Sequence, residues 1–231
     1  MRLRQMSPMN RRLALAGLAS FALAAPAAFA QDLRPRTPAA AVDIVALEGA
    51  ERDAALAAAN RTLNGVQSLQ GRFVQTAPGG ARSTGNFYLQ RPGRLRFEYD
   101  APATLLIVSD GSVVAMRDTA LRTTDRTPLR STPLNLILGD RIDLARNARI
   151  TRVSRSGLWT MITARDRSGQ TDGLITLNFH GEDSELRSWD ITDATGARTR
   201  ITLSDVTRPA NLDRGLFRLS DMLEDRRGGR R

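Results

Sequence analysis

The sequence contains no cysteine, no lysine and a single histidine, His180. Without cysteine the chain can form neither a disulfide nor a thiolate metal site, and it has no cysteine to act as a nucleophile or to carry a lipid. One imidazole without a thiol does not supply the ligands of a zinc site. His180 falls at the end of an expected strand, so we interpret it as a solvent-facing residue and predict no metal and no cofactor.

Signs of enzymatic chemistry are also scarce. A serine triad would need His180, and no strand–turn–helix elbow presents a serine. No phosphate-binding loop or dinucleotide fingerprint occurs. Because glycosidase-type carboxylates come from distant strands, the scattered acidic residues leave such a pair open. We therefore predict a protein without enzymatic activity, and keep an enzyme acting on lipid or glycan as an alternative.

The N-terminus has the three parts of an export signal. Arg2, Arg4, Arg11 and Arg12 come first, the apolar run 13–25 follows, and Ala28-Phe29-Ala30 provides a small-x-small cleavage site. The run is shorter than the roughly 20 apolar residues of a spanning helix. We predict that residues 1–30 are a cleaved signal peptide, and the pair Arg11-Arg12 leaves the twin-arginine route open beside the general one.

The net charge is strongly positive and comes from arginine alone. The formal charge is +10, and removing the four arginines of residues 1–30, which contain no acid, leaves 10 − 4 = +6. The arginines are spread along the chain, and export separates the protein from nucleic acid. We predict no nucleic-acid partner, whereas acidic protein surfaces or anionic lipid headgroups remain possible partners.

Composition divides the exported chain into three parts. Residues 31–50 are rich in Ala and Pro and predict a flexible leader. Residues 51–223 hold the periodic segments of one domain, beginning with an Ala-rich helix over 51–67. Residues 224–231 are charged and Gly-rich, which is typical of a disordered tail.

Alternation of apolar and polar residues predicts about eleven strands with short connections. In 94–99, for example, Leu95, Phe97 and Tyr99 share one face. The segment 131–139, with Pro133 in its first turn and Gly139 at its end, predicts one short helix. The expected strands are 69–77, 84–91, 94–99, 104–109, 113–117, 120–126, 148–154, 158–165, 174–180, 185–192 and 197–206. Without helices long enough to cross between parallel neighbours, the sheet should be antiparallel.

The alternating strands place a set of apolar residues on candidate inner faces. They are Phe73, Phe87, Leu89, Leu95, Phe97, Tyr99, Leu177, Phe179, Trp189, Ile191, Ile201 and Leu203. An ordinary packed core explains this pattern. A curved antiparallel sheet with helices as a cover can instead enclose an apolar cavity, and periodicity alone does not distinguish the two.

Three motifs in order give the chain a family resemblance. They are LQGRFVQT over 69–76, GNFYLQRPGRLRFEY over 85–99, and LIVSDG over 106–111. Together with the export signal and the segment Thr132-Pro133-Leu134, they make the chain resemble the LolA family of periplasmic lipoprotein carriers from about Leu63 to Phe217.

The resemblance implies a fold and a site. The fold is a mainly β, half-open antiparallel barrel covered by a lid of short α-helices. Arg91 corresponds to the family arginine that latches the lid, and Leu95 and Phe97 correspond to cavity-lining positions. The expected acyl-chain cavity is lined by Phe73, Phe87, Leu89, Leu95, Phe97, Tyr99, Leu134, Ile137, Leu138, Leu177, Phe179, Trp189 and Ile191, of which Leu134, Ile137 and Leu138 belong to the lid.

The resemblance also implies partners. A periplasmic carrier of this kind takes acylated outer-membrane lipoproteins from an inner-membrane ABC transporter of the Lol type. It delivers them to an outer-membrane acceptor, LolB-like or of unknown identity, and we expect it to act as a monomer. Because fold does not settle function, a related half-barrel that senses or regulates by binding lipid or lipoprotein, without transport, is the alternative.

Overall fold

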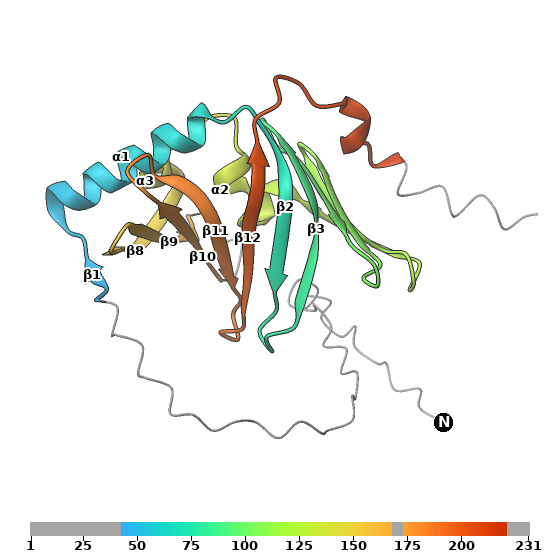
Figure 1. Ribbon diagram of the computed structural model, residues 1–231, viewed down its shortest axis with the longest axis horizontal. Helices are drawn as coiled ribbons and strands as arrows, with labels where there is room; N and C mark the ends of the chain where they lie inside the picture. The colour runs from blue at the N-terminus through green and yellow to red at the C-terminus, as the bar shows by residue number, and fades with distance from the viewer. Residues whose placement is uncertain (1–42, 168–172, 221–231) are drawn as a thin grey trace, which may run out of the picture. The chain divides into compact units, whose positions relative to one another are not determined.

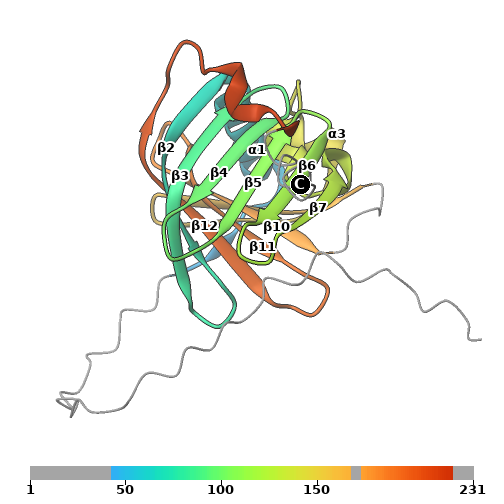
Figure 2. The same cartoon turned by 90° about the vertical axis from the view of Figure 1, so that its right-hand side faces the viewer.

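One curved sheet of antiparallel strands makes up most of the computed structural model, which describes residues 43–167 and 173–220. The expected signal peptide, most of the expected leader and the expected tail lie outside the described residues. Within them, the sheet has the order β1-β8-β9-β10-β11-β12-β2-β3-β4-β5-β6-β7. Figures 1 and 2 show the two halves of this sheet, and in Figure 2 β2–β5 form the near wall with β10–β12 running across behind it.

The elements have the following bounds. The strands are β1 Val45–Ala46, β2 Ser68–Thr76, β3 Arg82–Gln90, β4 Arg94–Tyr99, β5 Leu105–Asp110, β6 Val113–Asp118, β7 Thr123–Pro128, β8 Ala148–Ser156, β9 Trp159–Asp166, β10 Leu174–His180, β11 Glu185–Thr192 and β12 Arg198–Thr207. The helices are α1 Gly49–Gly65, α2 Asn135–Leu138 and α3 Leu144–Asn147, with 3₁₀ turns η1 Leu129–Ser131 and η2 Arg214–Phe217.

The sheet consists of two meanders, β2–β7 and β8–β12. They are joined by the pairing of β12, the last strand of one, with β2, the first strand of the other. Among the described strands, β1 and β7 lie at the two edges and do not pair with each other. The prediction of a mainly β, antiparallel and open architecture with short helices is therefore confirmed. All eleven expected strands are present, and β1 is an additional two-residue strand paired with β8.

Within the described residues, regular structure begins before the expected domain boundary at residue 51. Residues 45–50 were assigned to the leader by their composition, yet they include β1 and the first residues of α1. A two-residue strand has no alternation to detect. It is held by its pairing with β8 and by the bond from the Leu47 amide to the Val153 carbonyl (2.8 Å).

Helix α1 covers the inside of the curve. Its buried residues are Ala55, Leu56, Ala59 and Leu63, which recur at helical spacing on one face. They join the same apolar cluster as the inward side chains of the strands. Figure 1 shows α1 crossing the upper ends of β8–β11, with α2 and α3 close to the same end of the sheet.

The predicted helix over 131–139 is wrong in its extent. The structure has a 3₁₀ turn that ends at Ser131 and the separate helix α2, which begins at Asn135. Thr132 between them is extended, with φ −120° and ψ 148°. A residue before proline is disfavoured in the helical region, so Pro133 prevents one continuous helix here.

Candidate functional site

The thirteen residues expected to line a cavity are brought together on the inner side of the curved sheet. Nine of them are buried: Phe73, Phe87, Leu95, Phe97, Ile137, Leu138, Leu177, Phe179 and Trp189. Leu89, Tyr99, Leu134 and Ile191 are half-buried and pack against the same cluster. The sequence pattern therefore selected residues that share one apolar interior, although β2, β4 and β11 are far apart along the chain.

Aromatic rings connect the two halves of the sheet inside this cluster. Phe73 contacts Phe97 edge-on with ring centres 4.7 Å apart, and Phe97 contacts Trp189 at 6.3 Å. Tyr99 lies 5.0 Å from Phe73 and donates its hydroxyl hydrogen to Gln75 Oε1 at 2.6 Å. Burial raises the pKa of Tyr99, so this phenol stays neutral.

A small cavity lies between the lid and the sheet. Its volume is about 50 Å³, enough for one or two water molecules. Six of the expected residues line it: Phe87, Leu89, Arg91, Leu95, Ile137 and Trp189. Leu203, expected on an inner face, also lines it, whereas sequence reasoning did not assign to the cavity Leu63 and Val66 near the end of α1 or the polar Glu185 and Arg208. In this state lid side chains fill most of the space beneath the helices.

Arg91 binds the ends of both lid helices. Its Nη1 donates to the Leu63 carbonyl at the end of α1 (2.5 Å), and its Nε and Nη2 donate to the Gly139 carbonyl just after α2 (2.9 and 2.6 Å). Nη2 also reaches the Asp140 carbonyl at 2.6 Å. Arg91 is 8% exposed, and this burial lowers its pKa, with the charge of Asp140 acting in the opposite direction. The guanidinium of Arg91 remains charged nonetheless. Its positive charge lies at the C-terminal ends of α1 and α2, where the helix dipoles are negative.

The turn that carries Arg91 is fixed by contacts between two of the three motifs that give the resemblance, 85–99 and 106–111. A Cβ added to Gly93 would lie 2.6 Å from Gly111 Cα, so the β3–β4 and β5–β6 turns approach too closely for a larger residue. Ser109 Oγ donates to the Gly93 carbonyl at 2.7 Å. The Gly93 amide in turn donates to the Leu138 carbonyl at 2.8 Å, which ties the end of α2 to the same turn.

Two asparagines of α1 complete the attachment of the lid and were missed from the sequence. Asn64 donates to the Ile142 carbonyl (2.7 Å) and accepts from the Ile142 amide (2.9 Å). Asn60 accepts from the Leu144 amide at 3.0 Å. Asparagine is a poor helix former, and two of them four residues apart in an Ala-rich helix are a signal of local hydrogen bonding. These bonds join α1 to the segment between α2 and α3.

The described residues offer little else that could support chemistry. Across 43–167 and 173–220 there is no cluster of three or more metal-ligating side chains. The same residues include no helix with the length and hydrophobicity needed to cross a bilayer. His180 is half-buried and its ring contacts Trp159 at 4.6 Å between ring centres, outside the cavity lining.

The chain is similar in sequence to a known protein family. Residues 64–220 match the family described as "Outer membrane lipoprotein carrier protein LolA". The chain is 34% identical over 164 residues to an outer-membrane lipoprotein carrier protein of Leptothrix cholodnii, covering 66% of this chain and 75% of that one. It is 28% identical over 206 residues to the carrier protein of Cupriavidus pinatubonensis, covering 81% and 95%.

Among solved structures, the chain resembles a LolA superfamily protein of Nitrosomonas europaea at 11% identity, with a TM-score of 0.44 and 72% and 97% of the two chains covered. The family match extends over most of the described domain, from the last residues of α1 to beyond η2. This chain belongs to the LolA family of outer-membrane lipoprotein carriers, which are periplasmic and are not enzymes.

Proposed function

We propose that this protein carries the acyl chains of outer-membrane lipoproteins in the apolar space between the sheet and its lid. The observation that supports this most strongly is the placement of Arg91, which holds both α1 and α2 over an apolar interior through backbone carbonyls and the amide oxygen of Asn64, without a carboxylate. Such a latch can open without leaving an unpaired carboxylate behind.

The carrier has a clear physical task. At about 0.8 kcal/mol per methylene, exposing three long acyl chains to water would cost on the order of 30 kcal/mol. The cavity of about 50 Å³ is far too small for such chains, so the lid helices must move away from the sheet before cargo enters. The inner residues of β2–β4 and of β10–β12 would then contact the chains in place of Leu63, Ile137 and Leu138.

One polar group beneath the lid suggests where the polar part of the cargo lies. Trp189 is 3% exposed and lines the cavity, and its Nε1 has no hydrogen-bond partner. A buried donor without a partner costs about 1–3 kcal/mol. We propose that an ester carbonyl of the lipid accepts this hydrogen when cargo is bound.

Loading and unloading require partners. Burial of the acyl chains offsets the cost of opening the lid, but cargo must first be taken out of one membrane and later passed to another. We propose an inner-membrane ABC transporter of the Lol type as the donor of cargo and an outer-membrane acceptor, LolB-like or otherwise, as the recipient. Transfer toward the acceptor needs only a higher affinity for the same chains there.

The test is co-purification from the periplasm with a tagged lipoprotein. The acylated lipoprotein should co-purify with the wild-type carrier, whereas the same protein with its lipid-bearing cysteine replaced by serine should not. Equal recovery of both forms would overturn the proposal. For the indole contact, Trp189→Phe should weaken binding of a diester lipid more than that of the matching diether lipid, with Trp159→Phe as the control.

A further inference from the structure

One part of the outer face of the sheet, formed by β8, β9, β12 and the start of β3, carries six arginines that the carrier function does not use. We call this surface the arginine face, and it consists of Arg82, Arg149, Arg152, Arg165, Arg198 and Arg200. Its orientation follows from register. Leu177 pairs with Ile162 and with Trp189, and all three join the core under α1. Their neighbours along each strand therefore point to the other side.

The arginines form two adjacent rows across the strands. The first row crosses the sheet from β8 to β3, and each of its residues pairs with the next. In order, they are Arg152, Thr163, Thr176, Asp190, Arg200, Thr76 and Arg82. In the second row, two residues further along, Arg149 pairs with Arg165 and Thr192 pairs with Arg198. Positions two residues apart on a strand share one face, so the six guanidinium groups belong to one surface.

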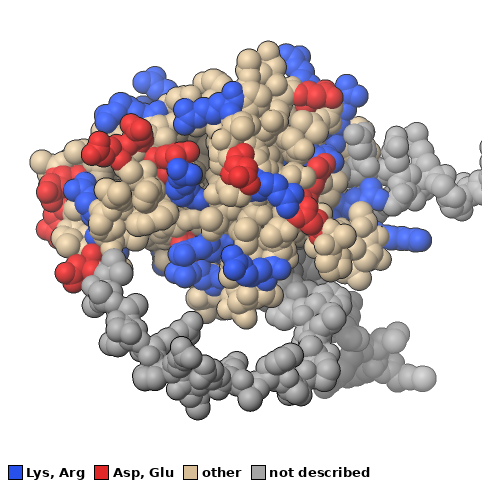
Figure 3. Space-filling model, viewed as in Figure 1, with Lys and Arg blue, Asp and Glu red and all other residues tan. Residues whose placement is uncertain are grey.

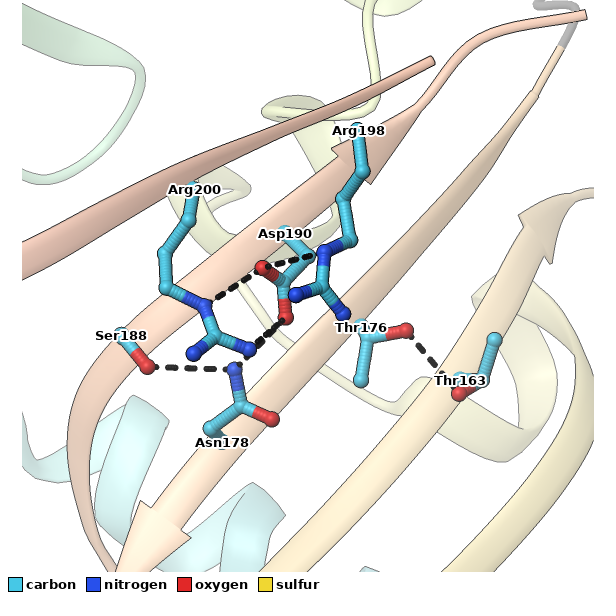
Figure 4. A network of polar contacts seen from close by, with 7 residues as sticks. All are labelled: Thr163, Thr176, Asn178, Ser188, Asp190, Arg198 and Arg200. Atoms are coloured by element: carbon cyan, nitrogen blue, oxygen red, sulfur yellow. Dashed lines mark hydrogen bonds and ion pairs between the residues drawn. The ribbon is translucent and has the colours of Figure 1, made fainter. Parts of the chain in front are cut away.

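Asp190 is the one carboxylate among the paired residues of these rows in the described strands. It accepts from Arg200 Nε (2.7 Å), lies 3.6 Å from Arg198 Nε, and also accepts from Asn178 (3.1 Å). Its side chain is 4% exposed, whereas those of Arg198 and Arg200 are 59% and 43% exposed. Figure 4 shows the two guanidinium groups converging on this buried carboxylate. Asp190 thus orients two arginines at the surface while neutralising only one charge.

The surface beside these two arginines is hollowed. A hollow of about 480 Å³ lies between the β2–β3 and β11–β12 turns, with Thr76, Pro78, Gly196, Arg198 and Arg200 among its lining residues. This volume is in the range of small-molecule sites. Figure 3 shows basic side chains over the lower ends of β11, β12 and β2 in that view, and basic and acidic side chains mixed over the rest of this face.

An exposed apolar tip lies on the same side of the molecule. Trp159 and Leu158 at the β8–β9 turn are 40% and 63% exposed. Trp159 and Arg165 are an even number of residues apart on β9, so they share a face, with roughly 20 Å between them along the strand. A tryptophan at one end of a basic surface is a combination found where proteins meet lipid headgroups.

We propose that the arginine face docks this protein on the surface of an anionic phospholipid bilayer. Guanidinium groups bind lipid phosphates through paired hydrogen bonds, and Trp159 and Leu158 enter the headgroup layer. An acidic protein surface would match the charge but would not account for an exposed indole and leucine at the edge of the face. This docking uses the outside of the sheet and does not depend on whether acyl chains occupy the inside.

The test is flotation of protein purified from the periplasm with vesicles. We expect binding to vesicles that contain phosphatidylglycerol, little binding to pure phosphatidylcholine vesicles, and loss of binding at high salt because the charges are exposed. The variant Arg149→Gln/Arg152→Gln/Arg165→Gln should bind on the order of a hundredfold more weakly at low salt, given roughly a fivefold effect for each arginine near an anionic membrane.

A matched control removes the same charge elsewhere. Arg61→Gln/Arg126→Gln/Arg130→Gln changes exposed residues on α1, β7 and η1 and should leave vesicle binding within a few-fold of wild type. Leu158→Asn should weaken the binding that remains at high salt. If both triple variants lost vesicle binding equally, net charge alone would explain the binding, and the proposal would be overturned. Absence of vesicle binding would also overturn it and assign the face to an acidic protein instead.

Discussion

The sharpest prediction concerns Arg91→Leu. Arg91 donates to the carbonyls of Leu63, Gly139 and Asp140 at 2.5–2.9 Å, and these lie on both lid helices or directly after them. Hydrogen bonds to a charged group contribute about 1.5–3 kcal/mol each. Leucine recovers part of the loss through apolar burial and by removing a desolvated charge. Three carbonyls lose about 4.5–9 kcal/mol of such bonds together, and after the part that leucine recovers we expect a net change of about 3–5 kcal/mol in lid closure.

That free energy corresponds to a change of roughly a hundredfold to a few thousandfold in the ratio of closed to open lid. Amide hydrogen exchange measures this ratio directly, because protection in α1 and α2 reports local opening. Protection of these helices should fall by that factor in Arg91→Leu, while β2–β4 and β10–β12 keep theirs. Arg91→Lys should fall between wild type and leucine, since a single ammonium cannot reach all three carbonyls in a planar fork.

Arg96→Leu is the matched control. The Arg96 side chain is also largely buried, at 17% exposed, and its Nη1 donates to the Leu216 carbonyl at 3.0 Å, but it holds the C-terminal segment and not the lid. It should lower protection around η2 and leave α1 and α2 unchanged. If Arg91→Leu and Arg96→Leu changed the lid equally, or if neither did, the latch would be refuted.

Three further predictions follow from other contacts. Thr62 on α1 donates to the Asp183 carbonyl at 3.0 Å, so Thr62→Cys/Asp183→Cys joined by a short cross-linker, in a chain without other cysteines, should abolish acyl-ligand binding until a reversible linker is cut. Gly85→Ala should lower the thermal midpoint markedly, because its Cβ would lie 2.1 Å from the Glu98 carbonyl oxygen. Hydrogen bonds from Arg72 and Thr84 lower the pKa of Asp100 in the folded protein. The ionised carboxylate therefore stabilises the folded state above the unfolded pKa of about 3.9, and this stabilisation is lost as the pH falls through the lower folded pKa. Unfolding titrations of Asp100→Asn should show a smaller loss of stability in that acid range.

The sequence predicted the strands well because alternation is a local signal. Leu95, Phe97 and Tyr99 could be placed on one face from six residues alone, and their burial follows from it. The short helix after β7 was predicted too long because its end signals, Pro133 and Gly139, were read without the restriction that proline places on Thr132. Segment β1 was missed because only its partner β8 makes it a strand.

The site was predictable only in part, for a related reason. The inward residues and Arg91 could be identified, since alternation and family motifs point to them. Asn60 and Asn64 could not, because polar residues on a helix are normally expected to face water, and only the fold brings the backbone of 142–144 against them. The arginine face has the same origin: arginines on four strands that are separated in the sequence become neighbours only through register.

The closed lid also explains how a carrier can release acyl chains whose exposure to water is so unfavourable. Leu63, Ile137 and Leu138 are 5%, 5% and 0% exposed, and each such side chain gains about 1.5–3 kcal/mol from burial. Opening the empty carrier sacrifices these contacts together with those of Arg91, so the measured affinity is the burial energy of the chains minus the cost of opening. A weaker latch should therefore increase affinity for cargo and slow its handover. Arg91→Leu should hold acylated protein more tightly than wild type, and a variant that bound more weakly and released faster would contradict this account.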